Sequence, residues 1–346
     1  MGMLDHWHPV LKSDELWKAP AEVKLAGESI AVFRTASGQL GAVANACPHR
    51  RLKLSVGTVV GERVQCRYHG WQFDACGNGE SPGTPKLTTC TTAYDVREEH
   101  GLIWLKSRGS VATFPDITVP GWFHISTLRH VVPAPLELTV DNFNEIEHSA
   151  TVHDTFGYDL ERLHEVNVRF EATDDSVRVV NVGPTKRIHP FFALLINIRR
   201  NDLFHDDWTT RFSPVYSVFD HWWTSPDLKR ESMVRWRLHV FFVPMDDRTT
   251  QVVSVTYAKS RYPGPNGALR LMKWKMREQI DREIQADIDM LHHMADYDRS
   301  LEGLKLSRFD KVMGLTRERI ARIYRGEVDP VAQATGSTGR QLLPPM

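Results

Sequence analysis

The stretches Cys47-Pro48-His49 and Cys66-Arg67-Tyr68-His69 decide how the first part of this chain folds, and sixteen residues separate them. Each stretch brings one cysteine thiolate and one histidine imidazole, which are both common metal ligands. Each stretch also falls where a predicted strand gives way to a turn. Two loops can therefore hold one metal centre between them.

The residues around these loops predict a small β domain. The apolar runs 30–33 and 40–43 flank the turn pair Ser37-Gly38, as in a β-hairpin. The short apolar run 102–105 predicts a buried strand. Glycine and proline then cluster between residues 109 and 120, which indicates a domain boundary.

The ligand types favour an iron–sulfur cluster over zinc. In a Rieske [2Fe–2S] cluster two cysteines hold one iron and two histidines hold the other. On this interpretation Cys47 and Cys66 bind one iron, and His49 and His69 bind the second. The alternative is a Cys2His2 zinc site, but zinc fingers usually pair cysteine with cysteine and histidine with histidine. A third reading treats the four residues as unrelated polar side chains.

A second group of ligands follows in the stretch from Asp141 to His153. His148 and His153 are five residues apart, so on an ideal α-helix they would point about 140° apart. Both can bind one metal only if the helix is irregular or ends between them. Two histidines and one carboxylate are the usual ligands of a non-haem Fe(II) that binds O2. The carboxylate must come from elsewhere in the chain.

A predicted helix at residues 267–296 can supply that carboxylate. Its apolar side chains recur at helical spacing and form one stripe, made of Met276, Ile280, Ile284, Ile288 and Leu291. Asp287 falls inside this stripe and Asp289 falls on the opposite side, at about 100° per residue. A buried carboxylate is costly unless it is paired or bound to metal. Asp287 is therefore preferred over Asp289 as the third ligand.

Both stretches resemble one family, the Rieske non-haem iron oxygenases, in their α subunit. Residues 47–51, 54–57 and 66–74 resemble the oxygenase type of Rieske domain, and 141–153 resembles the iron-binding motif. The resemblance implies an α+β protein. An N-terminal all-β Rieske [2Fe–2S] domain would precede a helix-grip-like catalytic domain with a central antiparallel sheet and helices. The expected limits, in order, are 1–115, 116–327 and a loosely ordered tail at 328–346.

The same resemblance implies roles for two further residues. Glu145 stands at the acid position three residues before the first histidine, where the family usually has aspartate. The resemblance also implies a ring of three subunits, in which His69 of one subunit donates a hydrogen bond to Glu145 of the next. Glu147 and Asp141 are the alternatives for this bridge. Asn142 is included among the catalytic residues.

Composition excludes several other classes of protein. Lys plus Arg equals Asp plus Glu at 43 each, which argues against a nucleic-acid binder with a broad basic surface. No apolar run reaches the roughly 18 residues that cross a bilayer, and the first residues do not form a secretory signal. Four cysteines do not make a disulfide scaffold, so we expect a cytoplasmic protein. Cys76 and Cys90 are expected to be structural or surface thiols.

The implied activity is that of a terminal oxygenase, which uses O2 and electrons from external NAD(P)H. The sequence contains no glycine-rich nucleotide-binding motif, so we expect a separate ferredoxin or reductase to deliver the electrons. Arg50, Arg51 and Arg67 flank the cluster loops and are either a docking site for an acidic donor or ordinary surface charges. An aromatic or heteroaromatic substrate is expected in a pocket built from residues 181–223, with six aromatic candidates: Phe191, Phe192, Phe204, Trp208, Trp222 and Trp223.

Monooxygenation or oxidative demethylation is the favoured reaction. The alternatives are ring cis-dihydroxylation, a Rieske electron carrier with an added domain, and a zinc-bound structural protein. A carrier would need only the first 110 residues, so His148, His153 and Asp287 argue against it.

Overall fold

The computed structural model describes residues 1–261 and 269–327, and these form two compact units. The first unit holds Met1–Pro115 together with the short segment Val243–Asp247. The second holds Asp116–Phe242 and the described residues from Arg248 onward.

The first unit is built from short antiparallel strands, as expected. They form three sheets, with the orders β1-β11-β10, β2-β3-β4 and β5-β6-β7-β8-β9. The hairpin expected between residues 30 and 43 is confirmed as β3 paired with β4. The strands are β1 His8–Lys12, β2 Ala21–Leu25, β3 Glu28–Arg34, β4 Leu40–Ala44, β5 Thr58–Val60, β6 Arg63–Gln65, β7 Gln72–Asp74, β8 Asn78–Glu80, β9 Thr89–Cys90, β10 Tyr94–Glu99 and β11 Leu102–Ser107.

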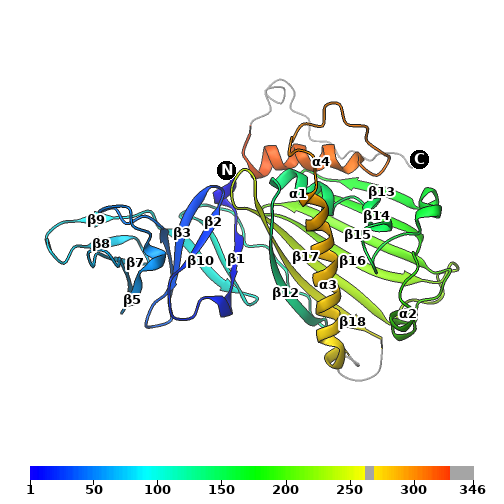
Figure 1. Ribbon diagram of the computed structural model, residues 1–346, viewed down its shortest axis with the longest axis horizontal. Coiled ribbons are helices and arrows are strands. Elements are labelled where there is room, and N and C mark those ends of the chain that lie inside the picture. The colour runs from blue at the N-terminus through cyan, green and yellow to red at the C-terminus, as the bar shows by residue number, and fades with distance from the viewer. Residues whose placement is uncertain (262–268, 328–346) are drawn as a thin grey trace. The chain divides into compact units, whose positions relative to one another are not determined.

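Among the described residues, the second unit is centred on a seven-stranded sheet with the order β12-β18-β17-β16-β15-β14-β13 (Figure 1). The strands β13 to β17 follow one another as an antiparallel meander, and β12 pairs antiparallel with β18. The strands are β12 Phe123–Val132, β13 Asn167–Ala172, β14 Ser176–Pro184, β15 Leu203–Phe212, β16 Val215–Thr224, β17 Val234–Pro244 and β18 Thr250–Ser260.

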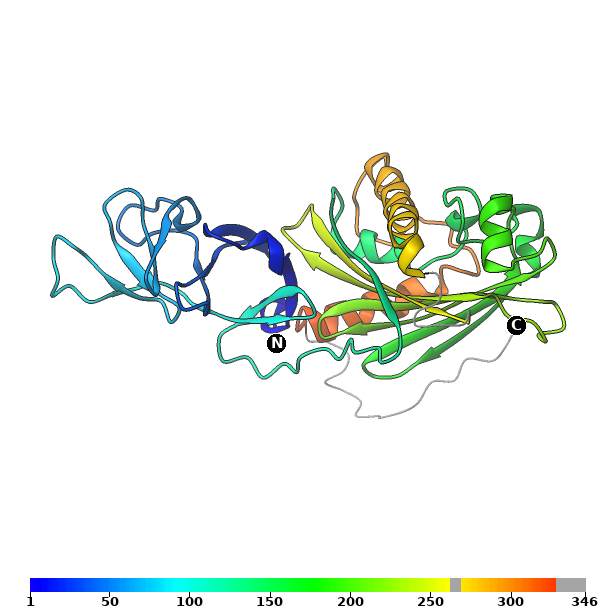
Figure 2. The ribbon, with the colours of Figure 1, turned by 90° about the horizontal axis from the view of Figure 1, so that it is seen from below.

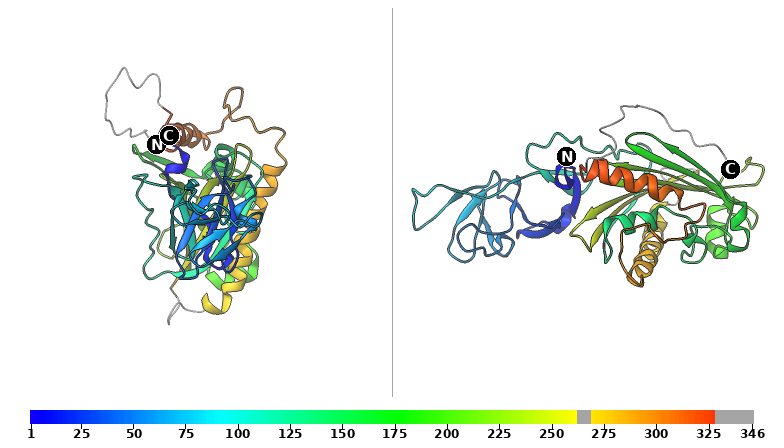
Figure 3. Two further views of the ribbon diagram at one scale, coloured as in Figure 1. Left: turned by 90° about the vertical axis from the view of Figure 1, so that its left-hand side faces the viewer. Right: turned by 90° about the horizontal axis from the view of Figure 1, so that it is seen from above.

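Helices cover one face of this sheet. Figures 2 and 3 show α1, α2 and α3 on the same side of it, with α3 crossing the strands. The α-helices are α1 Leu136–Phe143, α2 Pro190–Ile196, α3 Leu269–His292 and α4 Lys311–Arg319. An all-β unit followed by a large antiparallel sheet with helices confirms the predicted α+β fold class.

The helix expected at residues 267–296 is confirmed as α3, which ends at His292. Its start at 267 and 268 lies outside the described residues, as does the tail expected at 328–346. All five side chains of the predicted apolar stripe are buried. Among the described residues, no helix is both long enough and apolar enough to cross a membrane.

Candidate metal centres and substrate pocket

The two cluster loops have the same backbone geometry. The amide of Cys47 donates to the carbonyl of Leu52 (2.9 Å), and the amide of Cys66 donates to that of Trp71 (2.7 Å). The cysteine carbonyls accept from the residues four positions on, Arg51 (2.8 Å) and Gly70 (3.0 Å). Arg51 and Gly70 both have a positive φ, 60° and 73°, which closes each loop in the same way. Each loop therefore turns back immediately after its cysteine.

These loops bring the four predicted cluster ligands together. The thiols of Cys47 and Cys66 are buried and free, and they interact with each other. The rings of His49 and His69 are exposed, with their centroids 4.5 Å apart. Burial raises the pKa of the Cys47 thiol, so a thiolate there needs a cation beside it. Two buried thiols and two neighbouring imidazoles fit the ligand set of a Rieske cluster.

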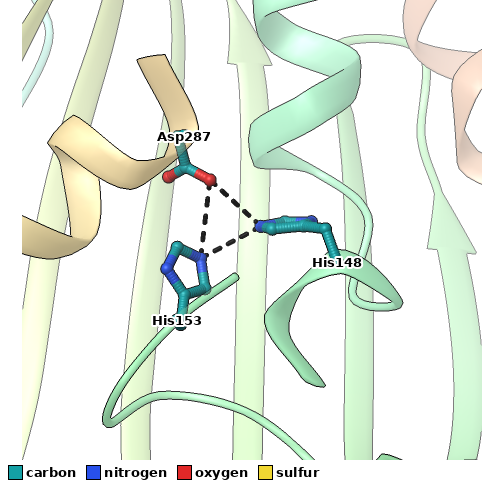
Figure 4. A group of neighbouring side chains, drawn as sticks. All are labelled: His148, His153 and Asp287. Carbon is teal, nitrogen blue, oxygen red and sulfur yellow. Dashed lines mark hydrogen bonds and ion pairs between the residues drawn. The ribbon is translucent and has the colours of Figure 1, made fainter. Parts of the chain in front are cut away.

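The second unit gathers the other predicted ligands at one point. Nε2 of His148 lies 3.0 Å from Nε2 of His153, and Oδ1 of Asp287 lies 3.2 Å and 3.5 Å from these two atoms (Figure 4). One ligand atom from each residue lies within 4.8 Å of the others. Asp287 is 5% exposed, whereas Asp289 is exposed and bonded to Gln285. Two imidazoles and one buried carboxylate fit an Fe(II) site with open positions.

The chain between the two histidines is not an α-helix. His148 begins the 3-10 helix η4, His148–Ala150, and His153 follows in an irregular segment. This break allows both imidazole rings to point toward one metal ion, because side chains five residues apart on a regular helix would diverge. Lys186 holds the segment in place, since its ammonium group donates to the carbonyls of Ser149 (3.0 Å), Ala150 (3.1 Å) and His153. Burial lowers the pKa of Lys186.

Each histidine is oriented by a second carboxylate on its far side. Nδ1 of His148 bonds to Glu145, and Nδ1 of His153 lies 2.9 Å from Oε2 of Glu283. Glu145 also accepts from the amides of Glu147 (2.6 Å) and His148 (3.2 Å), so its carboxylate is fixed against the chain. With Nδ1 of each ring close to a carboxylate, Nε2 of each ring is directed toward Asp287.

The site is electrostatically prepared for a cation. Burial by itself would lower the pKa of His148, but the carboxylates of Asp287 and Glu145 raise it to about 10. A metal ion at this point therefore replaces a tightly held proton. Asn142 donates to Oδ1 of Asp287 (3.1 Å), which places this predicted catalytic residue directly beside the ligand carboxylate.

The two alternative bridging acids have different surroundings. Asp141 is buried and bonded to Arg317, and burial raises its pKa to about 6 in spite of that partner. Its carboxylate is thus engaged in a structural ion pair. Glu147 lies with Glu145 along a groove beside α1 and the end of α3. The Asp141–Arg317 pair lines the same groove, and so do four further acids: Asp296, Asp298, Glu302 and Asp310.

A mostly apolar pocket adjoins the triad. Its aromatic lining is Phe143, Phe156, Phe204 and Phe219, and Leu238, Val240, Ile280 and Ile284 complete the apolar part. Of the six aromatic residues suggested by the sequence, Phe204 lines this pocket. The other five are elsewhere, which is a correction: Phe191 is 69% exposed, Phe192 lines a separate cavity, Trp208 and Trp223 are packed in the core, and Trp222 stacks on His205.

Glu283 is a functional candidate that the sequence analysis missed. Within the α3 stripe it stands one turn before Asp287, and it is 6% exposed. It accepts hydrogen bonds from the amides of Asp154 (3.2 Å) and Thr155 (2.9 Å) as well as from Gln279 (2.5 Å). The sequence did contain a signal for this residue, because Glu283 is a second acid on the predicted buried face of the helix.

We expect Glu283→Gln to weaken Fe(II) binding about 10- to 100-fold. Donors surround both carboxylate oxygens, so a glutamine NH2 would face a donor in either orientation and would release His153. Competition with a chromophoric chelator measures the dissociation constant. Glu278→Gln, on the exposed face of the same helix, is the control. Equal affinities in the two variants would contradict the role of Glu283.

Comparison with known proteins identifies both halves of the chain. Residues 6–115 match the Rieske [2Fe-2S] domain, and residues 132–325 match the vanillate O-demethylase oxygenase C-terminal domain. Methylxanthine N1-demethylase NdmA of Pseudomonas putida is 34% identical over 171 residues, 42% of this chain and 46% of that protein. The oxygenase component of chloroacetanilide N-alkylformylase from Rhizorhabdus wittichii is 30% identical over 236 residues, 64% and 62% of the two chains.

A solved structure agrees with these matches in fold. Dicamba monooxygenase bound to 3,6-dichlorosalicylic acid superposes with a TM-score of 0.76 at 17% identity, over 94% of this chain and 98% of that one. The chain spans less than two thirds of the length of the curated relatives that it matches.

A Rieske domain followed by an oxygenase domain defines the α subunits of Rieske-type non-haem iron oxygenases. The chain belongs to this family, and its C-terminal part is of the vanillate O-demethylase oxygenase type. The match to the Rieske [2Fe-2S] domain favours a Rieske cluster over zinc at the site of Cys47 and Cys66.

Proposed function

We propose that this protein is a terminal oxygenase that oxidises a small aromatic or heteroaromatic substrate by monooxygenation or oxidative demethylation. The observation that carries the proposal is the convergence of His148, His153 and Asp287 at the edge of a largely apolar pocket. Iron bound there would supply an open coordination position for O2. The names of two similar proteins, a demethylase and a monooxygenase, favour these reactions over ring cis-dihydroxylation, which is the second candidate.

The proposed ligands are those described above. Cys47 and Cys66 would hold one iron of the cluster and His49 and His69 the other, within a domain spanning residues 1–115. His148, His153 and Asp287 would hold the mononuclear iron, within a domain spanning 116–327. The phenylalanine-rich pocket wall would bind the substrate ring and exclude water from the open side of the triad.

Electrons would come from NAD(P)H through a separate ferredoxin or reductase. The sequence contains no glycine-rich nucleotide motif, and the Rhizorhabdus relative is named as the oxygenase component of its system. A cytoplasmic location belongs to the same proposal, because the cluster requires Cys47 and Cys66 as free thiols.

We further propose that three copies of the chain form a ring. Glu145 opens onto the acidic groove beside α1, while the cluster loops expose Arg50, Arg51 and Arg67. The basic loops of one copy are complementary in charge to the acidic groove of another. In this arrangement His69 of one subunit would donate to Glu145 of the next.

A turnover experiment tests the proposed reaction. The loaded protein is mixed with O2, a reductase system and a panel of small methoxy- and N-methyl-aromatic compounds, and the products are read by mass spectrometry. We expect a gain of one oxygen or the loss of a methyl group. A gain of two oxygens with the ring intact would favour dihydroxylation, and O2-independent or absent products would contradict an oxygenase.

A further inference from the structure

The pocket lining contains one polar pair that is neither a metal ligand nor a carboxylate supporting one. Asp206 on β15 lies directly opposite His221 on β16, and both side chains line the pocket. Nε2 of His221 lies 3.0 Å from Oδ1 of Asp206. The His221 ring packs against Phe156, Phe204 and Phe219, which restrict its orientation.

In the part of the chain that the structure describes, Oδ2, the second oxygen of Asp206, accepts no hydrogen bond. The side chain is 13% exposed and Oδ2 keeps some access to solvent, so water can donate to it while the pocket is empty. A ligand that displaces this water leaves the carboxylate oxygen unpaired unless it supplies a donor of its own. The ligand that fills the pocket is the obvious source of that donor.

The charges around the pocket restrict the ligand further. Four carboxylates line it: Glu145, Asp206, Glu283 and Asp287. The described residues of the lining include no lysine and no arginine. Even with a divalent ion at the triad, a negatively charged ligand would meet an excess of negative charge.

We propose that Asp206, held in place by His221, binds an O–H or N–H donor on an aromatic substrate that carries no negative charge. This inference rests on the proposed function, because it assigns the pocket beside the triad to the substrate. It assigns Asp206 as a residue that determines specificity and His221 as the residue that positions it.

The test measures ligand binding without turnover. The full-length protein, loaded with cluster and iron, is titrated anaerobically by calorimetry with three probes of similar size: 4-methoxyphenol, 1,4-dimethoxybenzene and 4-methoxybenzoate. We expect the phenol to bind about tenfold more tightly than dimethoxybenzene, as one buried hydrogen bond predicts, with the benzoate the weakest.

Asp206→Asn is expected to reverse this order. Its Oδ1 can still accept from His221, but an NH2 donor replaces Oδ2 and the negative charge is lost. The phenol should weaken about tenfold, while dimethoxybenzene and the benzoate should gain. His205→Leu is the matched control, since His205 is an equally buried histidine on β15 that faces away from the pocket and contacts Thr224. It should keep the wild-type order.

Three results would overturn the proposal: no preference for the phenol, an unchanged order in Asp206→Asn, or no binding of any probe. The outcomes separate this inference from the proposed function. Oxygenated products without a preference for the phenol would support the proposed function and contradict the role of Asp206. A preference for the phenol without any O2-dependent product would support the role of Asp206 and contradict the proposed function.

Discussion

Asp287→Ala is expected to remove the mononuclear iron and leave the cluster intact. The carboxylate is buried and closes the triad with His148 and His153. Among residues 1–261 and 269–327 it has no nearby substitute on that side, because Glu145 and Glu283 lie at the far nitrogens of the two rings. Iron content should fall from about three atoms per chain to about two. Product formation should fall by more than about a hundredfold, beyond the loss typical of a supporting residue.

Asp289→Ala provides the matched control for this prediction. Asp289 is the same residue type on the same helix, two positions on, and its side chain is exposed. We expect wild-type iron content, visible spectrum and product yield. If Asp287→Ala kept the third iron atom, or if the two variants lost iron equally, the assignment of the triad would be wrong.

When loaded with excess Fe(II), Glu145→Ala is expected to retain both metals and to form almost no product in a single turnover. The remaining contacts from Glu283 and Asp287 keep the iron ligands together. The variant loses the only described carboxylate that bonds Nδ1 of His148 and that is proposed to accept from His69 of the next subunit. Metal analysis and the product yield of the pre-reduced protein measure the two effects. A normal single-turnover yield would contradict the bridging role.

Glu147→Ala is the control for Glu145→Ala, because Glu147 lines the same groove and its carboxylate makes no hydrogen bond or ion pair with either histidine ligand among the described residues. It should give a product yield close to that of the wild type. A yield as low as that of Glu145→Ala would transfer the bridging role to Glu147.

Mixed oligomers test whether the bridge crosses between subunits. A Cys66→Ser variant lacks a cluster ligand but keeps Glu145, and Glu145→Ala keeps the cluster ligands. Each should be inactive by itself. Refolded or co-expressed mixtures should regain activity if His69 of one subunit serves Glu145 of another. Mixtures that stay inactive would place both groups in one subunit and contradict the proposed ring.

Much of this site could be predicted from short stretches of sequence. The spacing of Cys47, His49, Cys66 and His69 follows from two local loops, so their proximity required little tertiary information. The stripe on α3 separated Asp287 from Asp289, because a helix has a fixed period and a buried acid stands out within an apolar face. The hairpin of β3 and β4 followed in the same way from two apolar runs and the turn residues between them.

The pocket wall could not be predicted in this manner. Five of the six aromatic candidates between residues 181 and 223 lie outside the metal-side pocket, since aromatic side chains serve core packing as readily as ligand binding. Glu283 and Asp206 were missed for a related reason. Their roles depend on His153 and His221, which are brought beside them by α3 packing on the loop and by strand pairing.

The sequence by itself determined the ligand types, their local loops and the buried face of α3, because these depend on neighbours within a few residues. Only the tertiary structure decided that His148 and His153 converge, through the break after η4 and the grip of Lys186. It also decided that Glu145 and Glu283 support these two histidines and that Asp206 pairs with His221 at the pocket. Those assignments depend on the register of β15 against β16 and on where α3 crosses the sheet, and such long-range geometry is set by the packing of the whole domain.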